Sequence, residues 1–133
     1  VWNVHLDHSA TGMTAPEGRR TQLKPVLTRI GAARERTPSR GVVLVGDFNT
    51  LEAQEPVVDD AAAVLASALP GETATHVLGW RLDHLFFGGL LRKSAKVVTL
   101  PGSDHFAMLA DFDLPPASRT QREAATLPTL AGK

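Results

Sequence analysis

The chain has 133 residues, of which 43% are hydrophobic and 21% are charged, so its composition is that of one ordinary soluble domain. Lys and Arg number 14 and Asp and Glu number 14, so any surface that binds phosphate groups must be local. Cysteine is absent, which excludes disulfides, thiolate nucleophiles and Cys-based zinc sites. No run of about 18 apolar residues is present to span a bilayer. Both cytoplasmic and secreted proteins can lack cysteine, so the localisation stays open.

The first part of the chain predicts a strand, a helix and a second strand. Residues 1–6 are rich in β-branched and aromatic residues, and they read as a strand already under way, so we expect further sequence before them. From 17 to 36, apolar residues recur at helical spacing, and Pro25 predicts a kink or a helix start nearby. The four aliphatic residues at 42–45 are typical of a strand covered on both faces.

The second part predicts a short helix, three strands and a tail. Residues 58–69 are rich in alanine and predict a helix that ends at the Pro-Gly pair directly after them. Strands are expected at 81–87, 95–100 and 106–114. The residues after Pro115 turn polar and small, so we expect an ordered domain over 1–114 and a disordered tail over 115–133.

Polar clusters stand at the ends of three of these strands. Gly-Asp-Phe-Asn at 46–49 follows an apolar strand, where an acidic residue is costly unless it is paired, solvated or bound to a metal. Because Asp47 and Asn49 are two residues apart, an extended backbone would point both side chains the same way. The other clusters are Arg-Leu-Asp-His at 81–84 and Ser-Asp-His at 103–105.

These motifs resemble, in their order and spacing, the second half of the endonuclease/exonuclease/phosphatase superfamily. The resemblance is carried by Asn-Val-His-Leu-Asp-His at 3–8, Gly-Asp-Phe-Asn at 46–49, Arg-Leu-Asp-His-Leu-Phe at 81–86 and Ser-Asp-His at 103–105. One such motif is weak evidence, whereas four in the family's order are specific. The resemblance implies an α/β (α+β) fold, a four-layer sandwich of two mainly antiparallel sheets flanked by helices. This chain would be its C-terminal portion, truncated at the N-terminus.

The resemblance implies an activity for this chain, the metal-dependent attack of water on a phosphate ester. Displacement at phosphorus concentrates negative charge on oxygen atoms, so such a site needs a hard cation held by carboxylates. The resemblance implies Mg²⁺ as cofactor, with Mn²⁺ or Ca²⁺ as alternatives, and Asp104 and Asp47 as metal ligands. His105 would act on the nucleophilic water or stabilise the phosphoryl charge, and Asp83 would orient its imidazole.

The resemblance implies three further assignments. Asp47 would position or deprotonate the attacking water, and Asn49 would donate a hydrogen bond to a phosphate oxygen or to the nucleophile. His5 matches a histidine that, in the deoxyribonuclease and 5-phosphatase branches, contacts the scissile phosphate or assists the leaving group. The implied catalytic set is His5, Asp47, Asn49, Asp83 and His105.

The family also implies partners that these motifs do not supply. Its metal-binding Glu lies in the first half of the domain, so we expect a missing N-terminal half as a partner and an incomplete metal site in this chain alone. The substrate is expected to be a phosphate ester: a nucleic acid, a phospholipid headgroup or an inositol phosphate. The neutral charge and few aromatic residues give no basic stripe or stacking platform typical of a dedicated nucleic-acid binder.

Two other classes of function share parts of this pattern. A non-catalytic remnant or pseudoenzyme would keep the fold for binding, but the residues present together argue against it: Asp47, Asn49, Asp83, Asp104 and His105. A calcineurin-like metallophosphatase also has a Gly-Asp motif after a strand, but it needs a Gly-Asn-His-Asp/Glu element that the sequence lacks.

Several other conspicuous residues have structural interpretations. Arg19 and Arg20 are expected on a solvated face of the first helix. His84 follows Asp83 and points to the other face of its strand, so packing is expected for it. Trp80 is expected in the core by default, and His76 is assigned no firm role.

Overall fold

The computed structural model describes residues 1–8, 15–38, 40–51, 55–69, 71 and 73–116. Its elements are β1 (Trp2–His5), α1 (Ala15–Arg36), β2 (Val42–Asp47), α2 (Pro56–Ala62), β3 (Ala66–Ser67), β4 (Asp83–Gly88), β5 (Leu91–Val98) and β6 (Ala107–Asp113). Most of the expected elements are present. The tail predicted at 115–133 lies outside the described residues from 117 onward.

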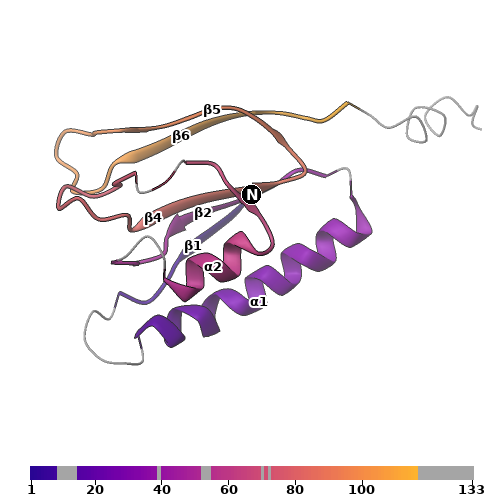
Figure 1. The fold of residues 1–133 in the computed structure, drawn as a ribbon, viewed down its shortest axis with the longest axis horizontal. Coiled ribbons are helices and arrows are strands. Elements are labelled where there is room, and N and C mark those ends of the chain that lie inside the picture. The colour runs from indigo at the N-terminus through magenta and orange to yellow at the C-terminus, as the bar shows by residue number, and fades with distance from the viewer. Residues whose placement is uncertain (9–14, 39, 52–54, 70, 72, 117–133) are drawn as a thin grey trace, which may run out of the picture.

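The strands form two sheets. The larger has the order β1-β2-β4-β3, in which β1 and β2 are parallel and the other pairs antiparallel, and β5 and β6 form an antiparallel hairpin. Figure 1 shows α1 and α2 on one side of the larger sheet and the hairpin on the other. The α+β fold class is therefore confirmed, with mainly antiparallel sheets and helices covering one face.

The core lies between the helices and the larger sheet. Leu23 and Ile30, seven residues apart on one face of α1, are fully buried. They belong to one cluster with Leu44 of β2, Phe86 of β4 and Val57 of α2. Each such side chain contributes about 1.5–3 kcal/mol by its burial, so this contact fixes the sheet against the helices.

Helix α1 is continuous through Pro25, where the sequence predicted a kink or a start. The helix begins at Ala15 and ends at Arg36. Pro25 cannot donate a hydrogen bond to the carbonyl of Thr21, and both residues are exposed. Solvent can therefore satisfy that carbonyl, and the helix continues.

The helix predicted at 58–69 is wrong in its second half. Helix α2 ends at Ala62, and Ala66–Ser67 forms the short strand β3 beside Phe86 and Phe87 of β4. The alanine content of this segment favours a helix, but the edge of β4 offers backbone hydrogen bonds that an isolated helix end does not. Tertiary pairing overrides the local propensity here.

The solvated face predicted for Arg19 is also wrong. Its guanidinium is buried and lies 2.5 Å from Oε2 of Glu55, which is buried as well. The other carboxylate oxygen of Glu55 accepts the backbone N–H of Leu51 at 2.8 Å. Arg20 is half-exposed and pairs with Asp60 of α2 at 2.7 Å. The two arginines therefore tie α1 to α2 and to the segment that follows β2.

Candidate active site

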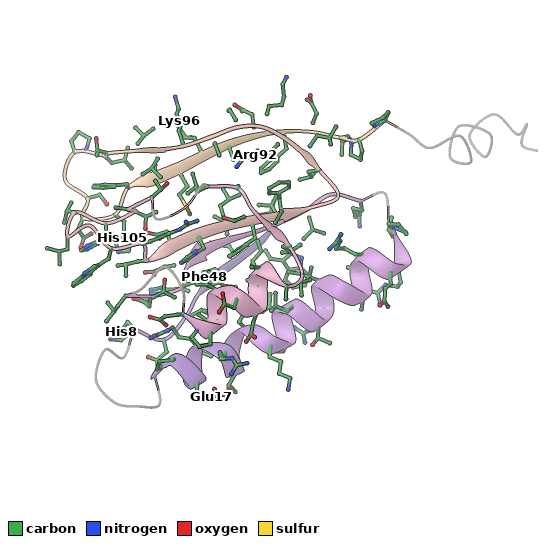
Figure 2. All side chains as sticks on the ribbon, viewed as in Figure 1. His8, Glu17, Phe48, Arg92, Lys96 and His105 are labelled. Atoms are coloured by element: carbon green, nitrogen blue, oxygen red, sulfur yellow. The ribbon has the colours of Figure 1, made fainter. Side chains whose placement is uncertain are left out.

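Strand register brings three of the expected catalytic residues to one edge of the sheet. His5 pairs with Asp47 across β1 and β2, and Asp47 pairs with Asp83 across β2 and β4. Because β1 and β2 are parallel, both end at this edge, and the antiparallel β4 begins there. Directly paired residues project their side chains on the same side of a sheet, so this row faces one way. Figure 2 places His105 at the same end of the molecule, where β4 and β6 begin.

His105 is held by Asp83, so the contact predicted between them is confirmed. His105 Nδ1 lies 2.8 Å from Asp83 Oδ2, and the two side chains are 34% and 14% exposed. Asp83 is fixed in turn, because its backbone N–H donates to Thr75 Oγ1 at 2.9 Å. A carboxylate at this distance places the ring proton on Nδ1, which leaves the Nε2 lone pair of His105 to accept a proton.

Asp47 lies next to this pair. Its Oδ1 accepts the backbone N–H of Asn49 at 2.8 Å, and its Oδ2 lies 3.7 Å from Nε2 of His5, whose side chain is 74% exposed. Ligand atoms of Asp47, Asp83 and His105 all lie within 4.8 Å of one another. Two carboxylates and one imidazole are therefore close enough together to share a metal ion.

Asn49 does not continue β2, so the extended backbone on which its alignment with Asp47 was predicted is not present. The strand ends at Asp47, and Asn49 has φ 53°, in the left-handed region that asparagine tolerates better than most residues. Its Nδ2 donates to the backbone carbonyl of Leu6 at 2.8 Å. Asn49 thus fastens the turn after β2 to the end of β1, beside His5.

Asp104 stands apart from the two other carboxylates. Its side chain is 73% exposed and lies 3.7 Å from Nε2 of His76. Ligand atoms of His76, Asp104 and His105 form a second group within 4.8 Å, so His105 belongs to both groups. Sequence reasoning assigned His76 no role, since this residue lies outside every predicted strand and its spacing carries no signal.

The donor set fits a hard divalent cation in part. Carboxylate oxygens are the ligands such ions prefer, and Asp47 and Asp104 both lie near His105, each in a different group of ligand atoms. Their ligand atoms do not belong to one group, so the described residues hold a cation incompletely.

His84 is a packing residue, as expected from its place in β4. The residue is fully buried, and its ring stacks on Phe86 and contacts Phe48. Its Nε2 lies 2.9 Å from Thr50 Oγ1, whose hydroxyl donates to the carbonyl of Arg81. Burial, aided by the Arg81 charge, lowers the pKa of His84 to about 3, so the ring is neutral at physiological pH.

His105 differs from His84 in its electrostatics. Partial burial lowers the pKa of His105, but the hydrogen bond to Asp83 and the negative charges of Asp83, Asp47 and Asp104 together outweigh it and raise the pKa above its usual range. The stability that the charged His105–Asp83 pair contributes is fully present below the pKa of an unfolded histidine, about 6.5. This stability is lost as pH rises through the higher pKa of His105 in the folded protein.

Asp83→Asn is expected to lower the pKa of His105 in the metal-free protein, because the hydrogen bond to a charged partner and the nearest negative charge are both removed. NMR titration of the His105 ring in both proteins, with chelator present, measures this directly. An unchanged titration midpoint would mean that Asp83 does not control the charge of His105.

Comparison with known proteins identifies the family of the chain. The model of the "Endonuclease/Exonuclease/phosphatase family" matches residues 4–105, which include His5, Asp47, Asn49, Asp83, Asp104 and His105. The chain belongs to the endonuclease/exonuclease/phosphatase family. The family's members are hydrolases of phosphate esters.

Curated relatives are longer than the chain. A UPF0294 protein of Vibrio vulnificus is 32% identical over 89 residues, which are 63% of this chain and 31% of the relative. A UPF0294 protein of Vibrio parahaemolyticus is 27% identical over 119 residues, which are 86% of this chain and 40% of the relative. The chain therefore spans less than half the length of these curated relatives.

Solved structures share the fold. The human Nocturnin catalytic domain with bound sulfate has a TM-score of 0.69 at 22% identity, covering 85% of this chain and 46% of that one. A functionally unknown conserved protein from Enterococcus faecalis has a TM-score of 0.70 at 20% identity, covering 85% and 49%. A mannosyl-6-phosphatase from Bacteroides thetaiotaomicron has a TM-score of 0.58 at 20% identity, covering 84% and 50%. Among the described helices, none is long and apolar enough to cross a membrane.

Proposed function

We propose that this chain is the C-terminal portion of the catalytic domain of a metal-dependent phosphoesterase that hydrolyses phosphate esters with activated water. One observation carries the proposal: Asp47, Asp83 and His105 come from three separate segments and converge within 4.8 Å, with His105 hydrogen-bonded to Asp83. Membership of a family of phosphate-ester hydrolases supports the same reaction class.

The Asp83–His105 pair supplies the proton chemistry. Asp83 fixes the tautomer and the orientation of the ring, and Nε2 of His105 accepts the proton of the attacking water or stabilises charge on the phosphoryl oxygens. Asp47, directly beside the pair, positions the water. A general base of this kind contributes about 10²–10⁴-fold to the rate.

Asp47 and Asp104 are the proposed ligands of a divalent cation, with Mg²⁺ as the proposed ion and Mn²⁺ or Ca²⁺ as alternatives. When bound, the cation neutralises negative charge that builds up on the phosphate oxygens. The largely exposed carboxylate of Asp104 and the partly buried one of Asp47 would each supply oxygen ligands to the cation.

His5 and Asn49 serve the phosphate in this proposal. The exposed imidazole of His5 contacts the scissile phosphate or assists the leaving group, and its 3.7 Å approach to Asp47 keeps it at the site. One N–H of the Asn49 amide donates to the Leu6 carbonyl. The second N–H of the same amide is therefore the one that donates to a phosphate oxygen or to the nucleophile.

We propose that residues preceding this chain complete the domain and supply the missing Glu ligand. The support is coverage: the chain accounts for 46–50% of the solved structures it matches and 31–40% of its curated relatives. The substrate classes proposed are nucleic acids, phospholipid headgroups and inositol phosphates.

Hydrolysis assays on the protein with any preceding residues test the proposal. We expect turnover of bis(p-nitrophenyl) phosphate or p-nitrophenyl phosphate in Mg²⁺, its loss in EDTA, and its recovery when Mg²⁺ is restored, because the site needs a hard cation. Plasmid DNA, a phospholipid and an inositol phosphate then separate the substrate classes. Turnover that is unaffected by EDTA, or no turnover of any of these esters by the folded protein, would contradict the proposal.

A further inference from the structure

His76 is a histidine beside the site that none of the proposed catalytic steps uses. Its side chain is only 10% exposed. The ring stacks on Trp80, with centroids 5.6 Å apart and planes 10° from parallel. It also forms a T-shaped contact with the ring of His105, with centroids 5.1 Å apart. Trp80 is 41% exposed, so the core position expected for it is wrong. Two aromatic contacts therefore fix the orientation of a polar ring directly next to the proposed general base.

Hydrogen bonding decides which nitrogen of His76 carries the proton. The backbone N–H of Leu78 donates to Nδ1 at 3.2 Å, so Nδ1 is an acceptor in this structure. A neutral imidazole has one donor and one acceptor nitrogen, which places the proton on Nε2. Nε2 lies 3.7 Å from Oδ2 of Asp104, so the donor nitrogen faces that carboxylate.

The same hydrogen bond argues against His76 as a metal ligand. The ligand atoms of His76, Asp104 and His105 are close enough to share an ion. Ligation through Nε2 would move the ring proton to Nδ1, where it would face the N–H of Leu78 and remove that hydrogen bond. His76 is therefore built to donate to Asp104.

Backbone contacts hold the two partners together. The N–H of Val77 donates to the carbonyl of Asp104 at 2.9 Å, and the N–H of Phe106 donates to the carbonyl of Thr75 at 2.7 Å. Between these two hydrogen bonds, the backbones of His76 and His105 form an isolated antiparallel β-bridge. The Asp104 carboxylate itself is 73% exposed, so a small rotation of that side chain closes the 3.7 Å separation to a hydrogen bond.

We propose that His76 is a positioning residue that donates its Nε2–H to Asp104 and thereby orients this carboxylate for the divalent cation. The inference rests on the proposed function, in which Asp104 is a metal ligand. Hydrogen-bonding partners of metal ligands typically change metal affinity by about 10–100-fold when they are removed.

Calorimetric titration with Mn²⁺ tests the inference in the protein with any preceding residues. His76→Gln places an amide N–H close to the position of Nε2, whereas His76→Asn places one near Nδ1, and His76→Phe keeps the ring stack without a donor. We expect His76→Gln to bind Mn²⁺ within about threefold of the wild type, and the other two variants to bind about 10–100-fold more weakly. Thermal unfolding of each variant confirms that the protein is folded.

The outcomes distinguish a failure of this inference from a failure of the proposed metal-dependent function. If the wild type binds Mn²⁺ and His76→Phe binds it equally well, His76 does not position Asp104. If His76→Gln binds as weakly as His76→Phe, the imidazole itself is a ligand and the donor role is wrong. If the wild type binds no Mn²⁺, the proposed metal-dependent function fails, and the inference fails with it.

Discussion

His105→Ala is expected to lower kcat for phosphate-ester hydrolysis by about 10²–10⁴-fold, the largest effect on activity that we expect from a single substitution. The reason is that Nε2 is the atom proposed to accept a proton at the reacting centre, and Asp83 holds the ring in the tautomer that makes this possible. Alanine removes the base and leaves the carboxylates in place. Steady-state rates in saturating Mg²⁺ measure the effect.

His8→Ala is the matched control for His105→Ala. It also removes a histidine, but His8 is an exposed residue just after β1 and has no place in the proposed machinery. The control is expected to keep its rate within about twofold, since exposed substitutions away from special features change little. Equal rates for the two variants would show that His105 does no chemistry.

Gly46→Ala is expected to have the largest effect on stability. Gly46 pairs with Val4 across the parallel strands β1 and β2, and its φ is +145°, a conformation that residues with a side chain rarely adopt. An added Cβ would lie 1.9 Å from the carbonyl oxygen of Val4, which is backbone and cannot rotate away. We expect a loss of about 4 kcal/mol or more in the free energy of unfolding, or a protein that does not fold.

Gly31→Ala is the matched control for Gly46→Ala. Gly31 lies inside α1, and nothing lies within 4 Å of the position its Cβ would take. It is expected to stabilise the helix by about 0.5–1 kcal/mol, because alanine loses less backbone freedom on folding. Urea unfolding of both variants measures the difference. A Gly46→Ala protein as stable as the wild type would mean that β1 and β2 are not packed as described.

The sequence could predict those site residues that lie next to the ends of strands. Asp47 and Asp83 lie at the paired ends of β2 and β4, so their proximity follows once these two strands pair. His105 comes just before β6 of the other sheet, and its predicted contact with Asp83 brings it to the same place. Asn49 could not be placed this way, because the strand ends at Asp47 and a left-handed turn redirects the next side chains.

Residues that depend on tertiary contacts were harder to predict. The helical pattern of α1 shows which face is apolar, but it does not show that a second helix covers Arg19 and pairs it with Glu55. His76 reaches the site only through the docking of its loop against Asp104 and Phe106, which are about 30 residues away in the sequence. Long-range contacts of this kind leave no periodic signal.

The central claim is that Asp83 and His105 act as one catalytic unit, and turnover in a double-mutant cycle tests it most directly. The four proteins are the wild type, Asp83→Asn, His105→Ala and the double variant, each assayed with a phosphate ester in saturating Mg²⁺. Residues that act as a unit give non-additive losses, so we predict a double variant about as slow as His105→Ala alone. Losses that multiply, or four equal rates, would contradict the claim.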